Sequence, residues 1–165
     1  MELLMKEIDV LTGEVKKGSA GSMITAHALG SCLGVVAYNI RTGEGGIAHV
    51  MLPGCCRSGV RDIRYARDAI ETLLEKLAPR GPTNENIRAA LAGGANVLRR
   101  PGDRIGRENI RSVREELERR GIEIIGESVG GANRRKIILD LSSGNLYCFE
   151  GDQAPKILAA FRVNE

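Results

Sequence analysis

The sequence predicts one domain, residues 1–165, of the α/β or α+β class. A chain of 165 residues that is 42% hydrophobic is long enough to bury one core and short for two ordinary domains. Short apolar runs rich in strand-forming residues alternate with two long segments whose apolar residues recur at three- and four-residue intervals. Strands interleaved with long helices are typical of folds that combine both kinds of element.

The first third of the chain predicts an extended segment followed by a β-hairpin. Residues 2–11 form a first strand or extended arm, and the glycines and serines of LTGEVKKGSAGS, at 11–22, indicate a turn or loop. LGVVAYN at 33–39 and IAHVMLP at 47–53 are short apolar runs of strand-forming residues. Because IRTGEGG at 40–46 is typical of a turn, the two runs are expected to pair as a hairpin.

Two segments have the periodicity of amphipathic helices. Between residues 61 and 77 the apolar side chains share one face, while charged residues occupy the other. Pro79 and Gly81 are expected to end this helix. RENIRSVREELERRG at 107–121 has the same spacing, and Gly121 stands where a glycine commonly follows the end of a helix.

The rest of the chain is expected to form mainly strands. IRAALAGGANVL at 87–98 predicts a strand that runs into a glycine-rich loop. IEIIGESV at 122–129, KIILDL at 136–141 and NLYCFE at 145–150 predict three more, the last two joined by a compact SSGN turn. The amphipathic APKILAAF at 154–161 is expected to be a short helix.

Charge and composition argue against several classes of protein. The 24 basic and 21 acidic residues are spread along most of the chain, so no basic tail is present. Aromatic residues make up 3% of the chain, which leaves few side chains for base stacking, and nucleic-acid binding is not expected. The N-terminus is acidic where a signal peptide is basic, and no stretch approaches the roughly 20 apolar residues that span a bilayer. A soluble, intracellular protein is therefore expected.

Four cysteines, at positions 32, 55, 56 and 148, are the residues with the most distinctive chemistry. The chain is large for a disulfide scaffold and lacks an export signal, so the thiols are expected to be reduced. A zinc site usually has paired ligands two to four residues apart, and adjacent Cys55 and Cys56 do not fit that spacing. No metal or cofactor is expected.

Cys32 stands where a nucleophile could act, directly after Gly30 and Ser31 and before the first strand of the hairpin. A thiol becomes nucleophilic as the thiolate, usually beside an imidazole. If the hairpin pairs so that Cys32 faces Met51, His49 projects from the same face as a diagonal neighbour, about 7 to 8 Å away between backbones. A register shift of one residue would send His49 to the opposite face.

The turn before Cys32 is also suited to charge stabilisation. Glycine lets the backbone approach a substrate, and N–H groups near Gly30 and Ser31 could then face an oxyanion. The alternative is that Cys32 packs as a small apolar side chain, which is common for free cysteines. The residues by themselves favour this buried role.

Five segments of the chain resemble the CheD family of chemoreceptor glutamine deamidases. They occur in the family's order and together extend the resemblance from about residue 10 to 150. The segments are LGSC at 29–32, AHVMLP at 48–53, GGAN at 93–96, IGRENIRSVREELERRGI at 105–122 and VGGANRRKIILD at 129–140.

The resemblance implies an α/β sandwich with mixed β-sheets, two long amphipathic helices and no cofactor. It implies hydrolysis of glutamine side-chain amides in the cytoplasmic domains of chemoreceptors, with Cys32 as the nucleophile and His49 as its base. It also implies a cytoplasmic protein that is not embedded in the membrane, and a CheC-type phosphatase as a second partner.

One position departs from the family's catalytic pattern. A threonine six residues before the cysteine orients the histidine in the family, and here that position holds Ala26. Thr25, one place earlier, is the nearest candidate for the role, which makes Cys32, His49 and Thr25 the expected catalytic residues. Arg134 also departs from the pattern, since the family often has glycine there.

An alternative hypothesis is a weakly active or inactive binding module for chemoreceptors or the phosphatase, in which the change at Ala26 has removed most activity. His27 could be an added acid or base, and Cys55 and Cys56 could be redox-sensitive. The simpler expectation for all three is a partly exposed or loop residue with no catalytic part.

Overall fold

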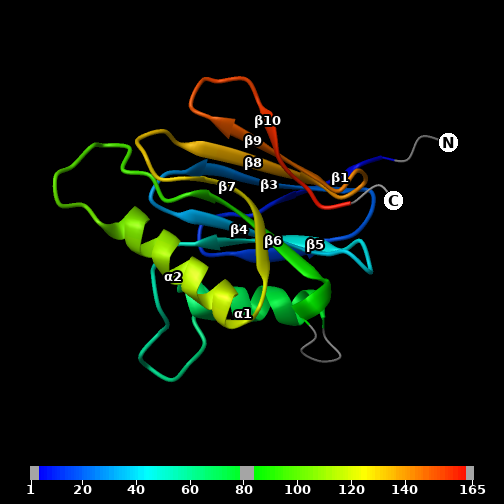
Figure 1. The fold of residues 1–165 in the computed structure, drawn as a ribbon, viewed down its shortest axis with the longest axis horizontal. Helices are drawn as coiled ribbons and strands as arrows, with labels where there is room; N and C mark the ends of the chain where they lie inside the picture. The colour runs from blue at the N-terminus through cyan, green and yellow to red at the C-terminus, as the bar shows by residue number, and fades with distance from the viewer. Residues whose placement is uncertain (1–3, 79–83, 163–165) are drawn as a thin grey trace.

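The structure, a computed structural model, describes residues 4–78 and 84–162, which form two five-stranded β-sheets and two α-helices in three layers (Figure 1). One sheet lies in the middle layer, with the helices on one face and the second sheet on the other, and we call it the central sheet. Its order is β2 (Val15–Gly18), β5 (Gly45–Val50), β4 (Leu33–Asn39), β6 (Ile87–Gly93) and β7 (Glu123–Val129). The other, the outer sheet, has the order β1 (Lys6–Asp9), β3 (Ser22–Leu29), β8 (Arg135–Asp140), β9 (Asn145–Glu150) and β10 (Lys156–Ala160).

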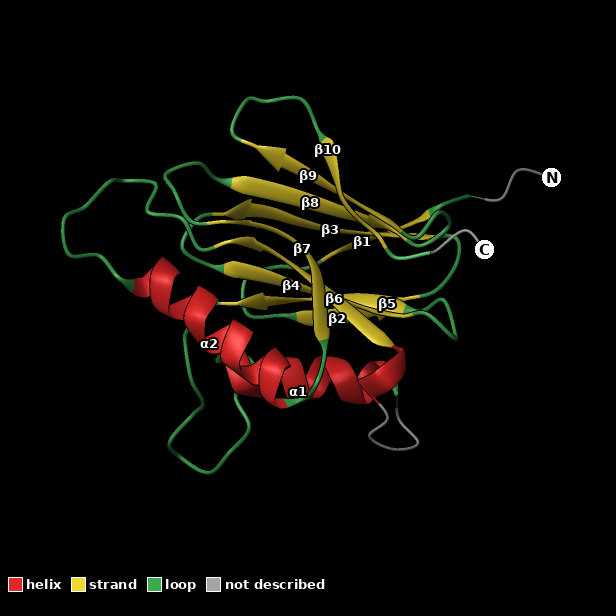
Figure 2. Cartoon of the chain, in the orientation of Figure 1, coloured by secondary structure: helices red, strands yellow, loops and turns green. Residues whose placement is uncertain are grey.

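Both sheets are mixed. β1 pairs in parallel with β3, and β6 with β7, while the other neighbouring strands run antiparallel. The helices α1 (Ala66–Leu77) and α2 (Ile105–Arg119) cover the face of the central sheet that is turned away from the outer sheet (Figure 2), and a short 3₁₀ turn, Asn84–Asn86, precedes β6. The observed architecture confirms the α/β sandwich with mixed sheets.

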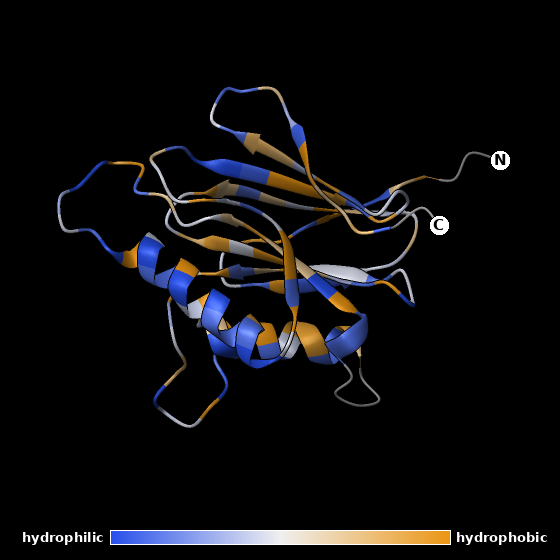
Figure 3. Cartoon of the chain, viewed as in Figure 1, coloured by the Kyte–Doolittle hydropathy of each residue, from blue (hydrophilic) through white to orange (hydrophobic). Residues whose placement is uncertain are grey.

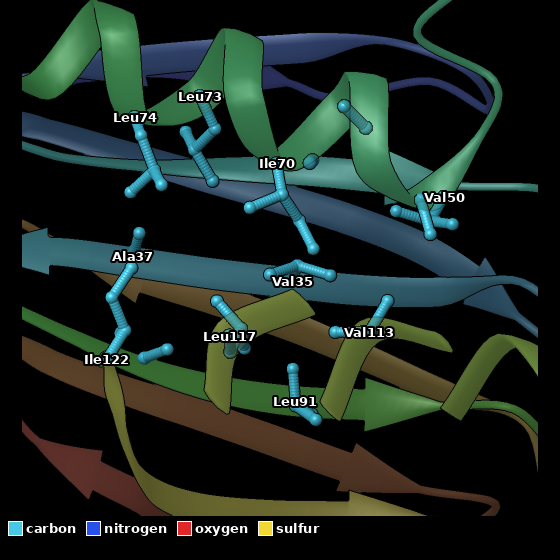
Figure 4. Close-up of a cluster of buried hydrophobic side chains, with 14 of the residues drawn as sticks. Val35, Ala37, Val50, Ile70, Leu73, Leu74, Leu91, Val113, Leu117 and Ile122 are labelled. Carbon is cyan, nitrogen blue, oxygen red and sulfur yellow. The ribbon is translucent and has the colours of Figure 1, made fainter. Parts of the chain in front are cut away.

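Burial of the central sheet on both faces explains why its strands are continuous apolar runs. All seven residues of β4 are buried, because alternate side chains pack against the helices and against the outer sheet. Figure 4 shows the helix side, where Ile70 and Leu73 of α1 point toward Val35 of β4. In Figure 3 β4 is mainly hydrophobic in colour, whereas both helices are banded, as amphipathic helices are.

The structure confirms the predicted hairpin, now β4 and β5, and the strands β1, β6, β7, β8 and β9 at their expected places. It also confirms α2, after which Gly121 takes the left-handed conformation, φ 71°, that ends a helix. Helix α1 begins at Ala66 rather than at 61, because the preceding backbone is extended and the Arg64 carbonyl accepts hydrogen bonds from Met51 and Leu52. Pro79 and Gly81, expected to end α1, lie outside the described residues.

Two expectations are wrong. The predicted turn at 11–22 contains strand β2, which pairs with β5; it is only four residues long, and its two lysines and one glycine carry little strand signal. The predicted short helix at 154–161 is instead the edge strand β10, because it pairs with β9 and is followed by Phe161, which is buried against Tyr38 with ring centroids 5.1 Å apart. Strand β3 was not predicted.

Candidate active site

The open end of the hairpin brings Cys32 and His49 to one face. The β4–β5 ladder pairs Gly34 with His49 and ends at Leu33 and Val50, the residues next to Cys32 and Met51. Cys32 is two residues before Gly34, so by strand alternation it belongs to the same face as Gly34 and His49. This is the register that the proposed Cys–His pair required. A side chain at Gly34 would meet residues of the outer sheet, so this face looks into the space between the two sheets.

The His49 ring is almost fully buried, with 3% of its surface exposed, and is held in a definite orientation. Its Nδ1 lies 3.1 Å from the carbonyl oxygen of Val10. A carbonyl oxygen only accepts, so Nδ1 carries the hydrogen and Nε2 of the neutral ring has a free lone pair. Nε2 is buried and has no hydrogen-bond partner among the described residues. It is therefore available to accept a proton.

Burial keeps both side chains neutral. It lowers the pKa of His49, against smaller opposing effects of the hydrogen bond to Val10 and the charge of Glu14. Burial likewise raises the pKa of the Cys32 thiol. Near neutral pH the resting state is thus a thiol and an imidazole, so a nucleophilic Cys32 has to lose its proton to a base during the reaction.

The turn that carries Cys32 is held by the glycine loop after β6. The N–H of Gly94 donates to the carbonyl of Cys32 at 2.9 Å, and the N–H of Ala95 donates to the carbonyl of Gly30 at 2.8 Å. A side chain at Gly93, where φ is 117°, would collide with the Cys32 carbonyl. Ala28, three residues before Ser31, also has a positive φ, 51°, which is uncommon outside glycine.

A buried amide from α2 completes the arrangement, and the sequence analysis missed it. The side-chain nitrogen Nδ2 of Asn109 donates to the carbonyls of Ser31, at 2.9 Å, and Met51, at 3.1 Å. Its oxygen Oδ1 is buried without a partner among the described residues. A polar residue beside Ile110 on the apolar stripe of a predicted helix was the signal that could have revealed it.

A cavity of about 180 Å³ lies next to the turn that carries Cys32. It is bounded by Gly94 and Ala95, by the first turn of α2 at Gly106, and by Gly130 and Gly131 after β7. Because Gly94 and Ala95 bind the backbone of the turn that carries Cys32, the cavity and the turn share a wall. Neither Cys32 nor His49 is among the residues that line it.

Known proteins resemble this chain over most of its length. A family model described as CheD chemotactic sensory transduction matches residues 51–149. The chain belongs to the CheD family. A relative from Haloarcula marismortui, named a probable chemoreceptor glutamine deamidase CheD, is 34% identical over 143 residues, covering 85% of this chain and 83% of the relative.

Relatives with the same name occur in other organisms. The one from Chlorobium luteolum is 36% identical over 89% of this chain and 74% of its own length, and the one from Pyrococcus horikoshii is 33% identical over 86% and 91%. Each of these three alignments spans at least 85% of the 165 residues of this chain, so each one extends over the positions of both Cys32 and His49.

The structure does not bring the Thr25 side chain to His49, although the CheD resemblance made Thr25 a candidate. Ala26 is fully buried between the sheets, and neighbouring strand residues point to opposite faces, so Thr25 projects from the other face of the outer sheet. Its backbone does take part, because the N–H of Val10 donates to the Thr25 carbonyl at 2.9 Å. Thr25 thus binds the backbone of Val10, the residue whose carbonyl binds His49.

The remaining candidates of the CheD chain lie apart from this pair. His27 is exposed, with Nε2 3.6 Å from the carboxylate of Asp9. Cys55 is exposed in the loop after β5, and Cys56 is half-buried with its sulfur 3.0 Å from the Ser58 hydroxyl. None of the helices in residues 4–78 and 84–162 has the length and apolar composition needed to cross a membrane.

Proposed function

We propose that this chain is a cysteine-dependent amidohydrolase that converts glutamine side chains of chemoreceptors to glutamate and ammonia. The observation that carries the proposal is the state of His49. Its Nδ1–H donates a hydrogen bond to the Val10 carbonyl. Its Nε2, which has no partner among the described residues, lies on the face to which Cys32 belongs. The names of the CheD relatives, probable chemoreceptor glutamine deamidases, supply the substrate class.

In the first half of the reaction, Nε2 of His49 takes the proton from the Cys32 thiol. The thiolate sulfur forms a bond to the carboxamide carbon, and the carbonyl oxygen gains the negative charge. The Cys32 N–H, which donates no hydrogen bond within the described residues, can stabilise that oxyanion. The C–N bond then breaks, and His49 returns its proton to the leaving nitrogen, which departs as ammonia.

In the second half, water hydrolyses the thioester. His49 takes a proton from the water while the water oxygen attacks the acyl carbon, and the C–S bond breaks to release glutamate. The proton on His49 returns to the sulfur and restores the thiol. Water is thus the only co-reactant in this scheme.

His49 is oriented by Val10 in this proposal, with Thr25 acting through its backbone carbonyl. A main-chain carbonyl that binds Nδ1 selects the tautomer with a free Nε2, as an orienting side chain would. The alanine at position 26 is therefore compatible with an active deamidase.

Two further parts of the proposal follow from the family. The substrates are glutamines on the cytoplasmic domains of chemoreceptors, which places the protein in the cytoplasm. A CheC-type phosphatase binds the deamidase and restrains it.

The test is to incubate the protein with a purified chemoreceptor cytoplasmic domain and to detect glutamines that have become glutamate by peptide mass spectrometry. Cys32→Ala and His49→Ala are expected to abolish the conversion, whereas Cys56→Ala and His27→Ala serve as matched controls and are expected to retain it. If the wild-type protein binds the receptor without modifying it, the alternative of a binding module replaces this proposal.

A further inference from the structure

We infer that Asn109 is a positioning residue that orients the oxyanion-binding N–H of Cys32; the inference rests on the function proposed above. Its Nδ2 binds the Ser31 carbonyl at 2.9 Å. The Ser31 carbonyl and the Cys32 N–H belong to the same trans peptide, so they point in opposite directions. By fixing the carbonyl toward α2, Asn109 aims the N–H away from α2 and leaves it free for the oxyanion.

The second hydrogen bond of Asn109 connects this peptide to the strand that carries His49. The ladder between β4 and β5 ends at Leu33 and Val50, one residue short of Cys32 and Met51. Beyond that point the Nδ2 group bridges the two chains by binding the carbonyls of Ser31 and Met51. One side chain thereby sets the nucleophile turn relative to the end of the strand on which the base stands.

Glycines bring α2 close enough for this contact. A side chain at Gly106 would collide with the backbone of Gly94, and a side chain at Gly94 would lie 2.5 Å from Ile110. The first turn of α2 therefore rests directly on the loop that holds Cys32. Asn109, fully buried on the same face of the helix, reaches the Ser31 carbonyl from there.

The Oδ1 of Asn109, which has no partner in the part of the chain that the structure describes, supports a role beyond packing. Buried polar atoms are nearly always hydrogen-bonded, and an unpaired acceptor is unfavourable for stability. An apolar side chain would fill this position on the α2 stripe without that penalty. An amide here is explained by the two donors it directs at the backbone of the site.

Three variants separate positioning from folding. Asn109→Asp keeps the size of the side chain but replaces the donating group with a carboxylate that faces two carbonyls, and Asn109→Ala removes the donors without adding charge. Asn39→Asp is the matched control: Asn39 is also buried and donates to a backbone carbonyl, that of Leu77, but from the other end of β4, roughly 25 Å along the strand.

Three reactions of each variant are compared, with the melting temperature measured alongside. Acylation of Cys32 by p-nitrophenyl acetate forms an oxyanion and needs no receptor. Alkylation of Cys32 by iodoacetamide displaces iodide and forms none. Deamidation of the receptor domain supplies kcat and KM. Peptide mass spectrometry assigns the first two reactions to Cys32.

We expect both Asn109 variants to lower acylation and kcat by about 10²–10³-fold, as the loss of an oxyanion donor does, with KM and alkylation unchanged. Asn39→Asp is expected to lower only the melting temperature. Acylation at the wild-type rate, or a parallel fall in alkylation, would show that Asn109 only supports the fold. No acylation of the wild-type protein would also overturn the inference. If the wild type is acylated but does not deamidate receptors, the proposed function fails, and the acylation rates still decide the role of Asn109.

Discussion

The Nδ1 of His49 lies 3.1 Å from the carbonyl oxygen of Val10, a contact that joins the central sheet to the segment that follows β1 of the outer sheet. Val10 is itself tied to β3 through the carbonyl of Thr25. The segment after β1 and the strands β3 and β5 thus combine to fix one imidazole. The orienting atom belongs to the main chain, so its presence does not depend on a particular side chain.

The acid limit of the activity should lie below the ordinary range of histidine. Burial lowers the pKa of His49, so its ring stays neutral, and able to accept the thiol proton, below the usual value of about 6.5. We expect the acidic limb of kcat/KM, measured by ammonia release, to have its midpoint below that value. A midpoint above it would indicate that another group acts as the base.

The same residue should make stability depend on pH. In the unfolded chain His49 takes up a proton near its ordinary pKa of about 6.5, whereas the buried ring resists protonation. Stability is therefore complete above that value and is lost as the pH falls through the lowered pKa of the folded state. Urea titrations between about pH 8 and pH 5 should show a larger loss for the wild type than for His49→Gln. Equal losses would contradict a buried, neutral His49.

Gly93→Ala should damage the turn that carries Cys32. Its new side chain would meet the Cys32 carbonyl in a backbone conformation that alanine rarely adopts. We expect a loss of about 3 kcal/mol in the free energy of unfolding, against about 1 kcal/mol for Gly21→Ala. Gly21 has a similar positive φ of 90° but open space around it, so the difference in urea unfolding measures the collision alone. Similar losses for the two variants would show that the turn adapts.

Arg135 should be the most important ion-pair residue for stability. Its side chain is 5% exposed, lies 2.8 Å from the Glu150 carboxylate and donates to the Asn133 carbonyl. Arg135→Met is expected to cost about 3–5 kcal/mol, because it leaves Glu150 without its partner. Arg114→Met, which breaks the half-exposed pair with Glu127, is expected to cost at most about 1 kcal/mol. Comparable costs in denaturant titrations would argue against burial as the deciding factor.

Phe161→Ala tests the last strand. Phe161 is 1% exposed and stacks on Tyr38, so the truncation should lower the free energy of unfolding by about 3–5 kcal/mol. Phe161→Leu retains most of the buried volume and should cost much less. If Phe161→Ala unfolds at the wild-type urea concentration, the C-terminal segment does not contribute to the core as the structure shows.

Sequence reasoning succeeded where burial leaves a simple pattern. LGVVAYN and IAHVMLP became β4 and β5 because a strand covered on both faces needs apolar residues at successive positions. It failed for β2 and β10, which are short edge strands whose local patterns resemble a turn and a helix. Their conformation depends on pairing: β2 pairs with β5, about 30 residues further along the chain, and β10 pairs with its sequence neighbour β9, and neither pairing leaves a clear signal in the local pattern.

In the candidate site, too, some features could be predicted from the sequence and others depend on tertiary contacts. The sequence by itself determined that a thiol and an imidazole stand at the open end of a hairpin, because residue type and short-range spacing are local properties. Only the tertiary structure decided that Thr25 points away from His49, that the Val10 carbonyl takes its place, and that Asn109 reaches the backbone beside Cys32. A backbone carbonyl is the same at every residue and an amide's partners lie on other elements, so these contacts exist only once the sheets and α2 have packed together.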